Sequence, residues 1–340
     1  MKQNLFLKQL AAFFDVYLPN KNCSKNTISA YAYGFTLFFE YMESVKSRAH
    51  NLIEYSELTP RLFDDYVLWM KNEKKYSPAS QKQRIAAIAS FLKYASRREM
   101  SAVYAYNSIV STSTPKIPDQ IFPYFSTTEI KLLLSVTKTN QKSGIRDLIL
   151  LSLMYDSGAR AQEICNLNIG DLYFCNTSKI RLQGKGCKAR EVPISKEVVK
   201  MLKIYLAKHN NSITANKNEP LFSSQRLERM TTACIRNIVK KYVALSKKEN
   251  PSLFKCESYS PHSLRHSKAV HMLEAGVPLI YIRNFLGHES VQTTEIYARV
   301  SQEGLNNAVK QHSLKTNIQA KLLISDKEQK KTANFLEKYL

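Results

Sequence analysis

Residues 260–300 read SPHSLRHSKAVHMLEAGVPLIYIRNFLGHESVQTTEIYARV. His262 and Arg265 stand three residues apart, so a helix would place both side chains on one face. Further along, His288 precedes Tyr297 by nine residues. These four residues supply three side chains that can donate hydrogen bonds and carry positive charge, together with one phenol. Such a set suits an anion bound beside a nucleophile.

Two earlier segments extend this set. In GARAQEICNL, residues 158–167, Arg160 precedes Glu163 by three positions. In QGKGCKAREVPI, residues 183–194, Lys185 stands at the tip of a predicted hairpin. We expect Glu163 to orient an arginine rather than to act as a catalytic base.

The combined residue types indicate phosphate chemistry. Two arginines, a lysine and two histidines are all donors, and no carboxylate cluster accompanies them, so they favour a phosphate over a metal ion. A tyrosine, whose free pKa is about 10, could attack that phosphate once cations or a base activated it. The leaving 5′ oxygen needs a proton, which a hairpin lysine can supply. This chemistry requires neither ATP nor metal, and no cofactor is expected.

Each residue also has a plainer interpretation. Arg160 could help to cap a helix, and Lys185 could be an ordinary turn residue. His262 and His288 could be buried histidines held by hydrogen bonds, and Tyr297 is one of 19 tyrosines. Only the order of these residues and their sequence context favour the catalytic interpretation.

The composition points to a polyanionic partner. The chain has 340 residues, with 50 Lys and Arg against 28 Asp and Glu, a formal charge of +22. With 44% hydrophobic residues it can fold, so the charge favours nucleic acid first and an anionic membrane surface second. No long apolar run occurs and the six cysteines are scattered, which argues against a secreted, membrane-spanning or zinc-ribbon protein. We expect a soluble cytoplasmic protein.

The N-terminal hundred residues show helical periodicity throughout. Ser77 and Pro78 have the pattern of a helix start, and the helix that follows has an apolar stripe. Its opposite face mixes small and basic side chains, and we expect it to contact DNA, the alternative being a solvated outer face. The candidate DNA contacts are Lys82, Lys93 and Arg97.

The whole chain is expected to be mainly α-helical with one small antiparallel β-sheet. Three short β-rich runs lie between residues 172 and 194, and Ser126 to Glu129 form a capping-box pattern. The expected divisions are a helical DNA-binding domain at 1–108, a linker at 109–125, a catalytic domain at 126–312 and a helical tail at 313–340.

These motifs resemble a known family. The matching order of residues is Arg160, Lys185, His262-x-x-Arg265, His288 and Tyr297. It resembles the active site of tyrosine-type site-specific recombinases, the phage integrase family, and all six positions are filled. GARAQEICNL is similar to the first arginine box of that family, and PHSLRH with the residues after it is similar to the second. The N-terminal half resembles the four-helix, SAM-like core-binding domain, and the short chain looks Xer-like or transposon-encoded.

The resemblance implies a role for each residue. Tyr297 would form a 3′-phosphotyrosyl intermediate and free a 5′-hydroxyl. Lys185 would protonate the 5′ oxygen, with Lys188 as the rival for that role. Arg160 and Arg265 would hold the non-bridging oxygens of the phosphate. His262 would take the tyrosine proton, and His288 would donate a hydrogen bond to the phosphate.

The resemblance also implies an assembly on double-stranded DNA. Two domains would clamp a target site, and a homotetramer, or an assembly with a related recombinase, would exchange strands through a Holliday junction. The tail would dock on a neighbouring protomer, and the outcome would be integration, excision or dimer resolution. The alternatives are relaxation of DNA by a type IB topoisomerase-like enzyme and a non-enzymatic DNA-binding protein, since residues 263–287 can be parsed as a helix-turn-helix around Gly276.

Overall fold

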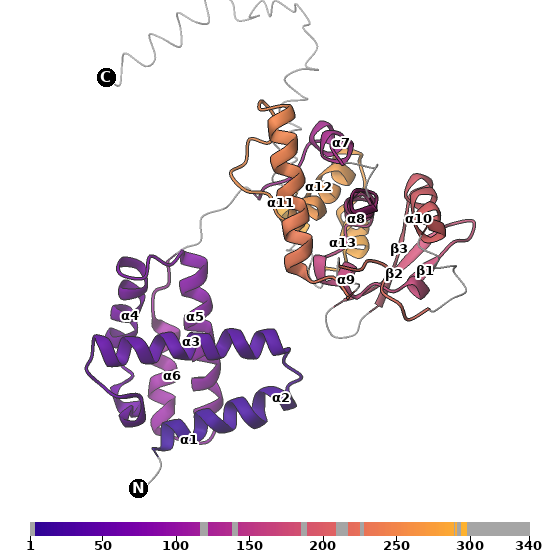
Figure 1. The fold of residues 1–340 in the computed structure, drawn as a ribbon. Helices are drawn as coiled ribbons and strands as arrows, with labels where there is room; N and C mark the ends of the chain where they lie inside the picture. The colour runs from indigo at the N-terminus through magenta and orange to yellow at the C-terminus, as the bar shows by residue number, and fades with distance from the viewer. Residues whose placement is uncertain are drawn as a thin grey trace, which may run out of the picture. The chain divides into compact units, whose positions relative to one another are not determined.

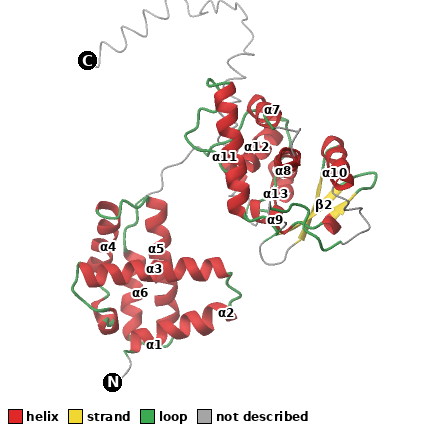
Figure 2. Ribbon diagram, in the orientation of Figure 1, coloured by secondary structure: helices red, strands yellow, loops and turns green. Residues whose placement is uncertain are grey.

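A computed structural model gives the fold of the chain (Figure 1). It describes residues 4–115, 122–137, 142–184, 189–208, 217–224, 228–288, 290 and 294–297. These residues form two compact units, divided between Gln120 and Ile121, and each unit has its own hydrophobic core. Helices dominate both units, and the second also contains a small sheet, as Figure 2 shows. Within the described ranges no helix is both long and apolar enough to cross a membrane.

The first unit is built from helices packed around an aromatic-rich core. The α-helices are α1 (Leu5–Ala12), α2 (Leu18–Asn20), α3 (Lys25–Ser44), α4 (Pro60–Asn72), α5 (Pro78–Ala95) and α6 (Ser101–Ser111). The remaining helical segments are the π-helical η1 (Phe13–Tyr17), which joins α1 to α2, and the 3-10 turns η2 (His50–Leu52) and η3 (Tyr55–Glu57).

Helix α5 begins as its sequence predicts. The Ser77 hydroxyl accepts a hydrogen bond from the Ser80 backbone N–H, and Pro78 occupies the first turn, where no N–H is needed. The expected apolar stripe is buried at Ile85, Ile88, Leu92 and Ala95. Helix α3 crosses α5 (Figure 1), and a Cβ on Gly34 would lie 3.1 Å from the Ala87 Cβ.

Helix α6 differs from expectation. No local pattern predicts this helix, and residues 109–111 of the expected linker form its last part. Ala102, Ala105 and Ile109 are buried in the core of the first unit, so packing rather than local sequence accounts for this helix.

The second unit contains seven described α-helices and the sheet. The helices are α7 (Thr127–Ser135), α8 (Lys142–Ser157), α9 (Ala161–Asn166), α10 (Lys196–Lys208), α11 (Thr232–Glu249), α12 (Pro261–Glu274) and α13 (Leu279–Leu286). The 3-10 turn η4 (Ile169–Asp171) precedes the sheet, and residues 294–297 form a further helical turn. The expected capping box opens α7, where the Glu129 carboxylate accepts from the Ser126 N–H and the Ser126 hydroxyl accepts from the Glu129 N–H.

The predicted three-stranded antiparallel sheet is confirmed. Its strands β1 (Leu172–Tyr173), β2 (Lys179–Gln183) and β3 (Ala189–Pro193) pair in sequence order. Ile180 pairs with Val192, and both side chains are fully buried. Arg190 lies on β3, the second strand of the hairpin, and pairs with Leu182 on β2.

Candidate active site

Arg160 is placed by a tight turn between two helices. Helix α8 ends at Ser157, and Gly158 adopts φ +58°, a left-handed conformation that a side chain would strain. Arg160 is the N-cap residue of α9. Its Nη2 donates to the Gly287 carbonyl at 3.3 Å, which ties the start of α9 to the end of α13.

Glu163 lies beneath Arg160 and binds two arginines. The Glu163 carboxylate accepts from the backbone N–H of Arg160 at 2.9 Å and from its Nη1 at 2.9 Å. Arg190, on β3, donates to the two carboxylate oxygens through Nη1 and Nη2, each at 2.8 Å. Burial raises the pKa of Glu163, but the bonds from Arg190 and Arg160 outweigh it and hold this pKa below its ordinary value. The contact expected between Glu163 and an arginine is present.

Arg265 is only 3% exposed. Its Nη1 donates to the Gly158 carbonyl and its Nη2 to the Leu286 carbonyl, both at 2.7 Å. Burial, followed by the positive charge of Arg160, lowers the pKa of Arg265 from its ordinary value. Both arginines are thus anchored at the C-terminal end of α13, by bonds to adjacent carbonyls.

Tyr297 is 1% exposed and reaches a histidine that the sequence analysis did not single out. Its hydroxyl lies 2.9 Å from Nδ1 of His266, and its ring meets Phe122 edge to face at 5.1 Å. Burial raises the pKa of Tyr297, and the opposing effect of Arg265 and Arg160 is smaller. Burial likewise lowers the pKa of His266 to about 4. The phenol is therefore protonated and the imidazole neutral. In the tautomer that carries its proton on Nε2, Nδ1 of His266 accepts the hydrogen of the phenol.

His288 stands beside the tyrosine ring. Their ring centroids are 6.3 Å apart and nearly parallel, and His288 Nδ1 lies 2.9 Å from the Thr294 hydroxyl oxygen. Burial, with Arg265 and Arg160, lowers the pKa of His288 to about 4. In the tautomer whose Nδ1 accepts from the Thr294 hydroxyl, the neutral ring carries its proton on Nε2, where it can be donated.

His262 lies in the first turn of α12 and is exposed. Its ring centroid is 6.3 Å from that of His266, one helical turn later. Loss of hydration lowers the pKa of His262, and the charges of Arg265 and Arg160 lower it further.

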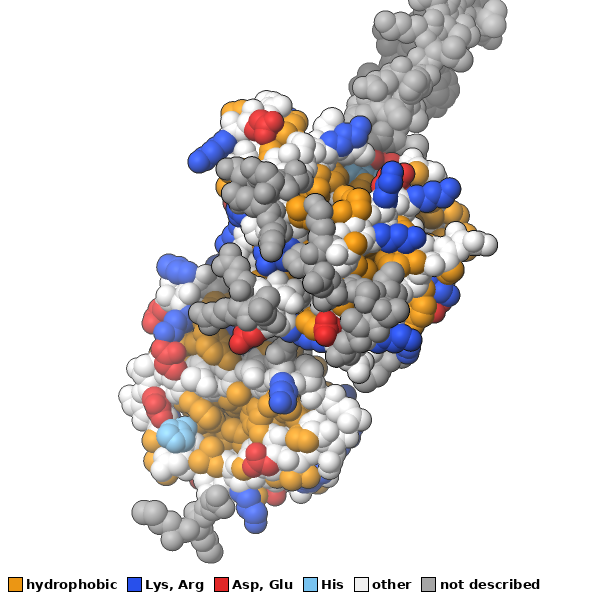
Figure 3. Space-filling view, turned by 45° about the vertical axis from the view of Figure 1, so that its right-hand side comes forward, with side chains coloured by type: hydrophobic (Ala, Val, Ile, Leu, Met, Phe, Trp, Pro, Cys, Tyr) orange, Lys and Arg blue, Asp and Glu red, His pale blue; other side chains and the backbone are white. Residues whose placement is uncertain are grey.

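The predicted site residues are therefore partly brought together. Five of them lie in one group. Arg160, His262, Arg265 and His288 are named here the arginine–histidine cluster, and Tyr297 lies beside them. Lys185 and Lys188 lie outside the described residues, as does the tail at 313–340. Lys82, Lys93 and Arg97 are exposed on the first unit, on α5 and just beyond its end. Figure 3 shows Lys and Arg side chains at many points of the face of the second unit that is in view.

Sequence reasoning missed two members of the site. His266 follows His262 by one helical turn, so the same-face spacing used for Arg265 could have indicated it. Arg190 carried no such signal, because its partners Glu163 and Phe285 are 27 and 95 positions away.

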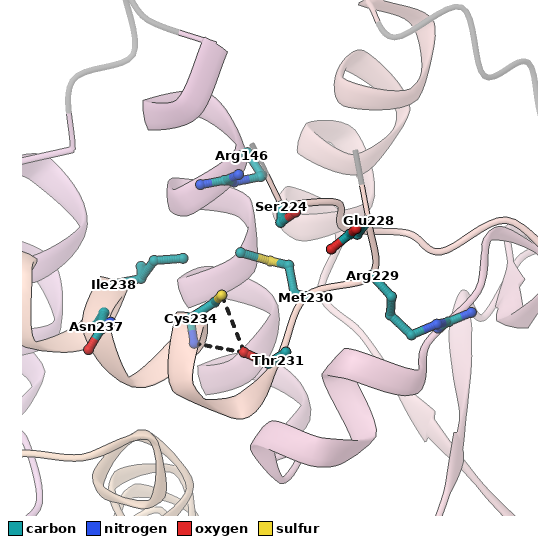
Figure 4. Close-up of a pocket in the computed structure, with 9 residues that line it drawn as sticks. All are labelled: Arg146, Ser224, Glu228, Arg229, Met230, Thr231, Cys234, Asn237 and Ile238. Atoms are coloured by element: carbon teal, nitrogen blue, oxygen red, sulfur yellow. Dashed lines mark hydrogen bonds between the residues drawn. The ribbon is translucent and has the colours of Figure 1, made fainter. Parts of the chain in front are cut away.

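A separate hollow of about 450 Å³ lies between α8 and α11 (Figure 4). Its two arginines are already bonded: Arg146 donates to Asp147 and to the Ser223 carbonyl, and Arg229 to the Cys165 carbonyl and to Asn168. The hollow shares no residue with the arginine–histidine cluster.

Comparisons with known proteins identify the family of the chain. The description "Phage integrase family" matches residues 123–303, and "Phage integrase, N-terminal SAM-like domain" matches residues 7–102. Tyrosine recombinase XerC of Pelotomaculum thermopropionicum is 32% identical over 298 residues, 86% of this chain and 94% of that protein. Tyrosine recombinase XerA of Pyrococcus horikoshii is 31% identical over 305 residues, 88% and 92% of the two chains.

The fold also matches a solved structure. XerH site-specific recombinase, bound to palindromic difH substrate in a post-cleavage complex, superposes with a TM-score of 0.69. The match covers 85% of this chain and 80% of that one at 22% identity, so it is a likeness of fold.

Proposed function

This chain belongs to the phage integrase family and is a site-specific tyrosine recombinase, and from that premise we propose that Tyr297 is its nucleophile and the arginine–histidine cluster its phosphate site. One observation supports the assignment above the others. Arg160 and Arg265, more than 100 residues apart in sequence, are anchored to adjacent carbonyls at Gly287 and Leu286, beside the tyrosine.

The two arginines are suited to hold the scissile phosphate. A guanidinium has five N–H groups in a fixed fork, and the bonds described here use two from each side chain. The others can bind the non-bridging oxygens, whose charge grows as the phosphorus becomes five-coordinate. Because the protein bonds fix both guanidinium planes beforehand, little reorganisation accompanies the reaction.

The proton of Tyr297 has an acceptor in place. We assign its first transfer to His266, which the hydroxyl already contacts, whereas the resemblance implies His262. In this assignment His262, exposed at the start of α12, faces the phosphate together with Arg265. His288 donates from Nε2 to a phosphate oxygen, because its Nδ1 is engaged by Thr294.

The reaction balances without an external energy source. The Tyr297 oxygen forms a bond to phosphorus, the bond from phosphorus to the 5′ oxygen breaks, and Lys185 gives that oxygen a proton. The phosphotyrosyl ester retains the energy of the original bond, so the 5′-hydroxyl of another strand can reverse the step and join the strands.

The substrate and assembly follow from the same proposal. The chain would bind double-stranded DNA sites in the cytoplasm through both basic units, and four copies would synapse two sites and pass through a Holliday junction. Relaxation by a topoisomerase-like enzyme is not favoured, given the family match. Helices α12 and α13 are joined by a turn at Gly276, but α12 buries Arg265 within the site, which a purely DNA-binding helix-turn-helix would not require.

A suicide substrate tests the proposal. A duplex nicked next to the scissile phosphate loses its short 5′-hydroxyl fragment after cleavage, so the covalent adduct accumulates on a denaturing gel. Wild-type protein should form the adduct in EDTA, and Tyr297→Phe should form none while binding the duplex with nearly unchanged affinity. An adduct with Tyr297→Phe would show that another residue is the nucleophile.

The proton acceptor is tested in the same assay. His266→Phe should slow adduct formation more at pH 7 than at pH 9, where more of the phenol ionises without a base. A pH-dependent loss with His262→Phe, and not with His266→Phe, would return the role to His262.

A further inference from the structure

Arg190 makes more contacts with the site than its position in the sequence suggests. Its side chain is 14% exposed. Nη1 and Nη2 form a two-pronged bond to Glu163, and Nε donates to the Phe285 carbonyl at 3.1 Å. Three of its five N–H groups are thus bound within the protein, against two for Arg160, and its side chain is less exposed than that of Arg160, which is 35% exposed.

The side chain also packs against the end of α13. Gly287 adopts φ +66°, and a Cβ placed on it would lie 2.9 Å from the Arg190 Cδ and 3.1 Å from its Nε. Arg190 therefore touches the residue whose carbonyl accepts from Arg160. It links β3, the start of α9 and the end of α13.

The charges around Glu163 explain why a second arginine is needed. With Arg160 alone, the buried carboxylate would neutralise the cation that should meet the phosphate. With Arg190 present, the three groups carry a net positive charge, and the field of Arg190 reaches Arg265 and His288. Among the described residues, the other charged or titratable groups that interact with Glu163 are Arg265 and His262, both on α12.

We propose that Arg190 is a positioning residue, which holds Glu163 so that Glu163 can aim Arg160 at the scissile phosphate while the charge of Arg160 stays available. This rests on the proposed phosphate site. Arg190 itself touches neither phosphate nor tyrosine in the reaction. Its loss would leave a buried carboxylate with one cation, and that cation would turn inward to it.

The first measurement is adduct formation on the nicked duplex with saturating protein. Arg190→Gln should lower the cleavage rate by about 10- to 100-fold, the effect typical of residues that orient a ligand. Because the pKa of Glu163 rises without Arg190, the cleavage rate of Arg190→Gln should fall more steeply between pH 7 and pH 5 than the wild-type rate. Arg181→Gln, an equal change of charge at an exposed position of β2, is the matched control and should stay within about twofold of wild type.

The double variant E163Q/R190Q provides the decisive comparison. Since both residues act through Arg160, the double variant should cleave no more slowly than Arg190→Gln and should lose the additional acid sensitivity. Losses that multiply in the double variant, or wild-type cleavage by Arg190→Gln, would overturn the proposal. Arg190→Lys keeps the charge without the two-pronged bond, so it should cleave at an intermediate rate. If Arg190→Gln does not fold, a wild-type rate for Arg190→Lys overturns the proposal.

A stability measurement separates this proposal from the proposed function. The loss of denaturation midpoint caused by Arg190→Gln should be larger at pH 7, where Glu163 is ionised, than at pH 4. Equal losses of the denaturation midpoint at both pH values would mean that Arg190 contributes packing alone, whatever the cleavage rate of the variant. The opposite outcome is that wild-type protein forms no adduct while Arg190→Gln still shows the expected pH-dependent loss of stability. That result would refute Tyr297 as the nucleophile and leave the Arg190–Glu163 contact supported.

Discussion

Replacing Gly158 by alanine should destabilise the second unit and misplace Arg265. Two costs add. The φ of +58° is left-handed, which costs a residue with a Cβ roughly 1–2 kcal/mol. The new Cβ would also lie 2.8 Å from the Leu286 Cδ2 and 3.3 Å from the Phe285 Cε1. Leu286 is fully buried and cannot swing aside, so overpacking adds about 1–3 kcal/mol.

The expected loss is therefore about 2–5 kcal/mol in the free energy of unfolding. Gly276→Ala is the matched control, because Gly276 also has a left-handed φ, of +81°, but nothing lies within 4 Å of its added Cβ. That variant should lose only about 1–2 kcal/mol.

Urea unfolding followed by two probes checks this prediction. Far-UV circular dichroism reports both units, whereas fluorescence of Trp69, the only tryptophan, reports the first unit. Gly158→Ala should shift the dichroism transition and leave the Trp69 transition in place. Cleavage should also fall, because the Gly158 carbonyl accepts the 2.7 Å bond from Arg265. Equal losses for the two glycine variants would refute the packing argument.

Three further predictions concern titration, leaving-group chemistry and DNA contacts. The pKa values of His266 and His288, about 4 in the folded protein against an ordinary 6.5, mean that the unfolded chain binds more protons between these values. The contribution of these two histidines to stability should thus be constant above pH 6.5. The free energy of unfolding should fall by roughly 3 kcal/mol per histidine toward pH 4, and urea midpoints that do not change over this range would contradict it. Cleavage by Lys185→Ala should be restored by a substrate with sulfur at the 5′ bridging position, and a failure of rescue would remove Lys185 as the acid. Alanine at the three candidate DNA contacts of the first unit should reduce the slope of log K against log salt by about 2–3, and an unchanged slope would place the DNA elsewhere. Those positions are Lys82, Lys93 and Arg97.

Local signals in the sequence were sufficient for several elements of the fold. The caps at Ser77 and Ser126 act within three residues, so their helices begin where predicted. The alternating β-rich runs likewise predicted the three strands that pair in the sheet. Helix α6 was missed because its sequence, SAVYAYNSIVS, runs into a Ser- and Thr-rich stretch, and burial of Ala105 and Ile109 decides its conformation.

Five of the six predicted catalytic residues lie in one group in the structure, but the contacts that join them were less predictable. The spacing of Arg160 and Glu163 within one turn indicated their contact, which the structure contains. The partners of Arg190 depend on how β3 and α13 pack, which no local pattern encodes. The ionisation of Tyr297 also depends on packing. Cations or a base were expected to activate the phenol. Burial outweighs the effect of the nearby cations on its pKa, which leaves the alternative of a base.

The resting ionisation of the site determines how the tyrosine must react. With the pKa of Tyr297 raised, almost no phenolate exists before attack, and a bound phosphodiester, being negative, would raise that pKa further. The same negative charge would offset the field of Arg265, which helps to keep the pKa of His266 low. Substrate binding therefore makes the imidazole a stronger base while it makes the free phenolate less accessible. With Tyr297 as the proposed nucleophile, proton transfer to a histidine would accompany the attack on phosphorus, and DNA binding would itself prepare the phenol for that step.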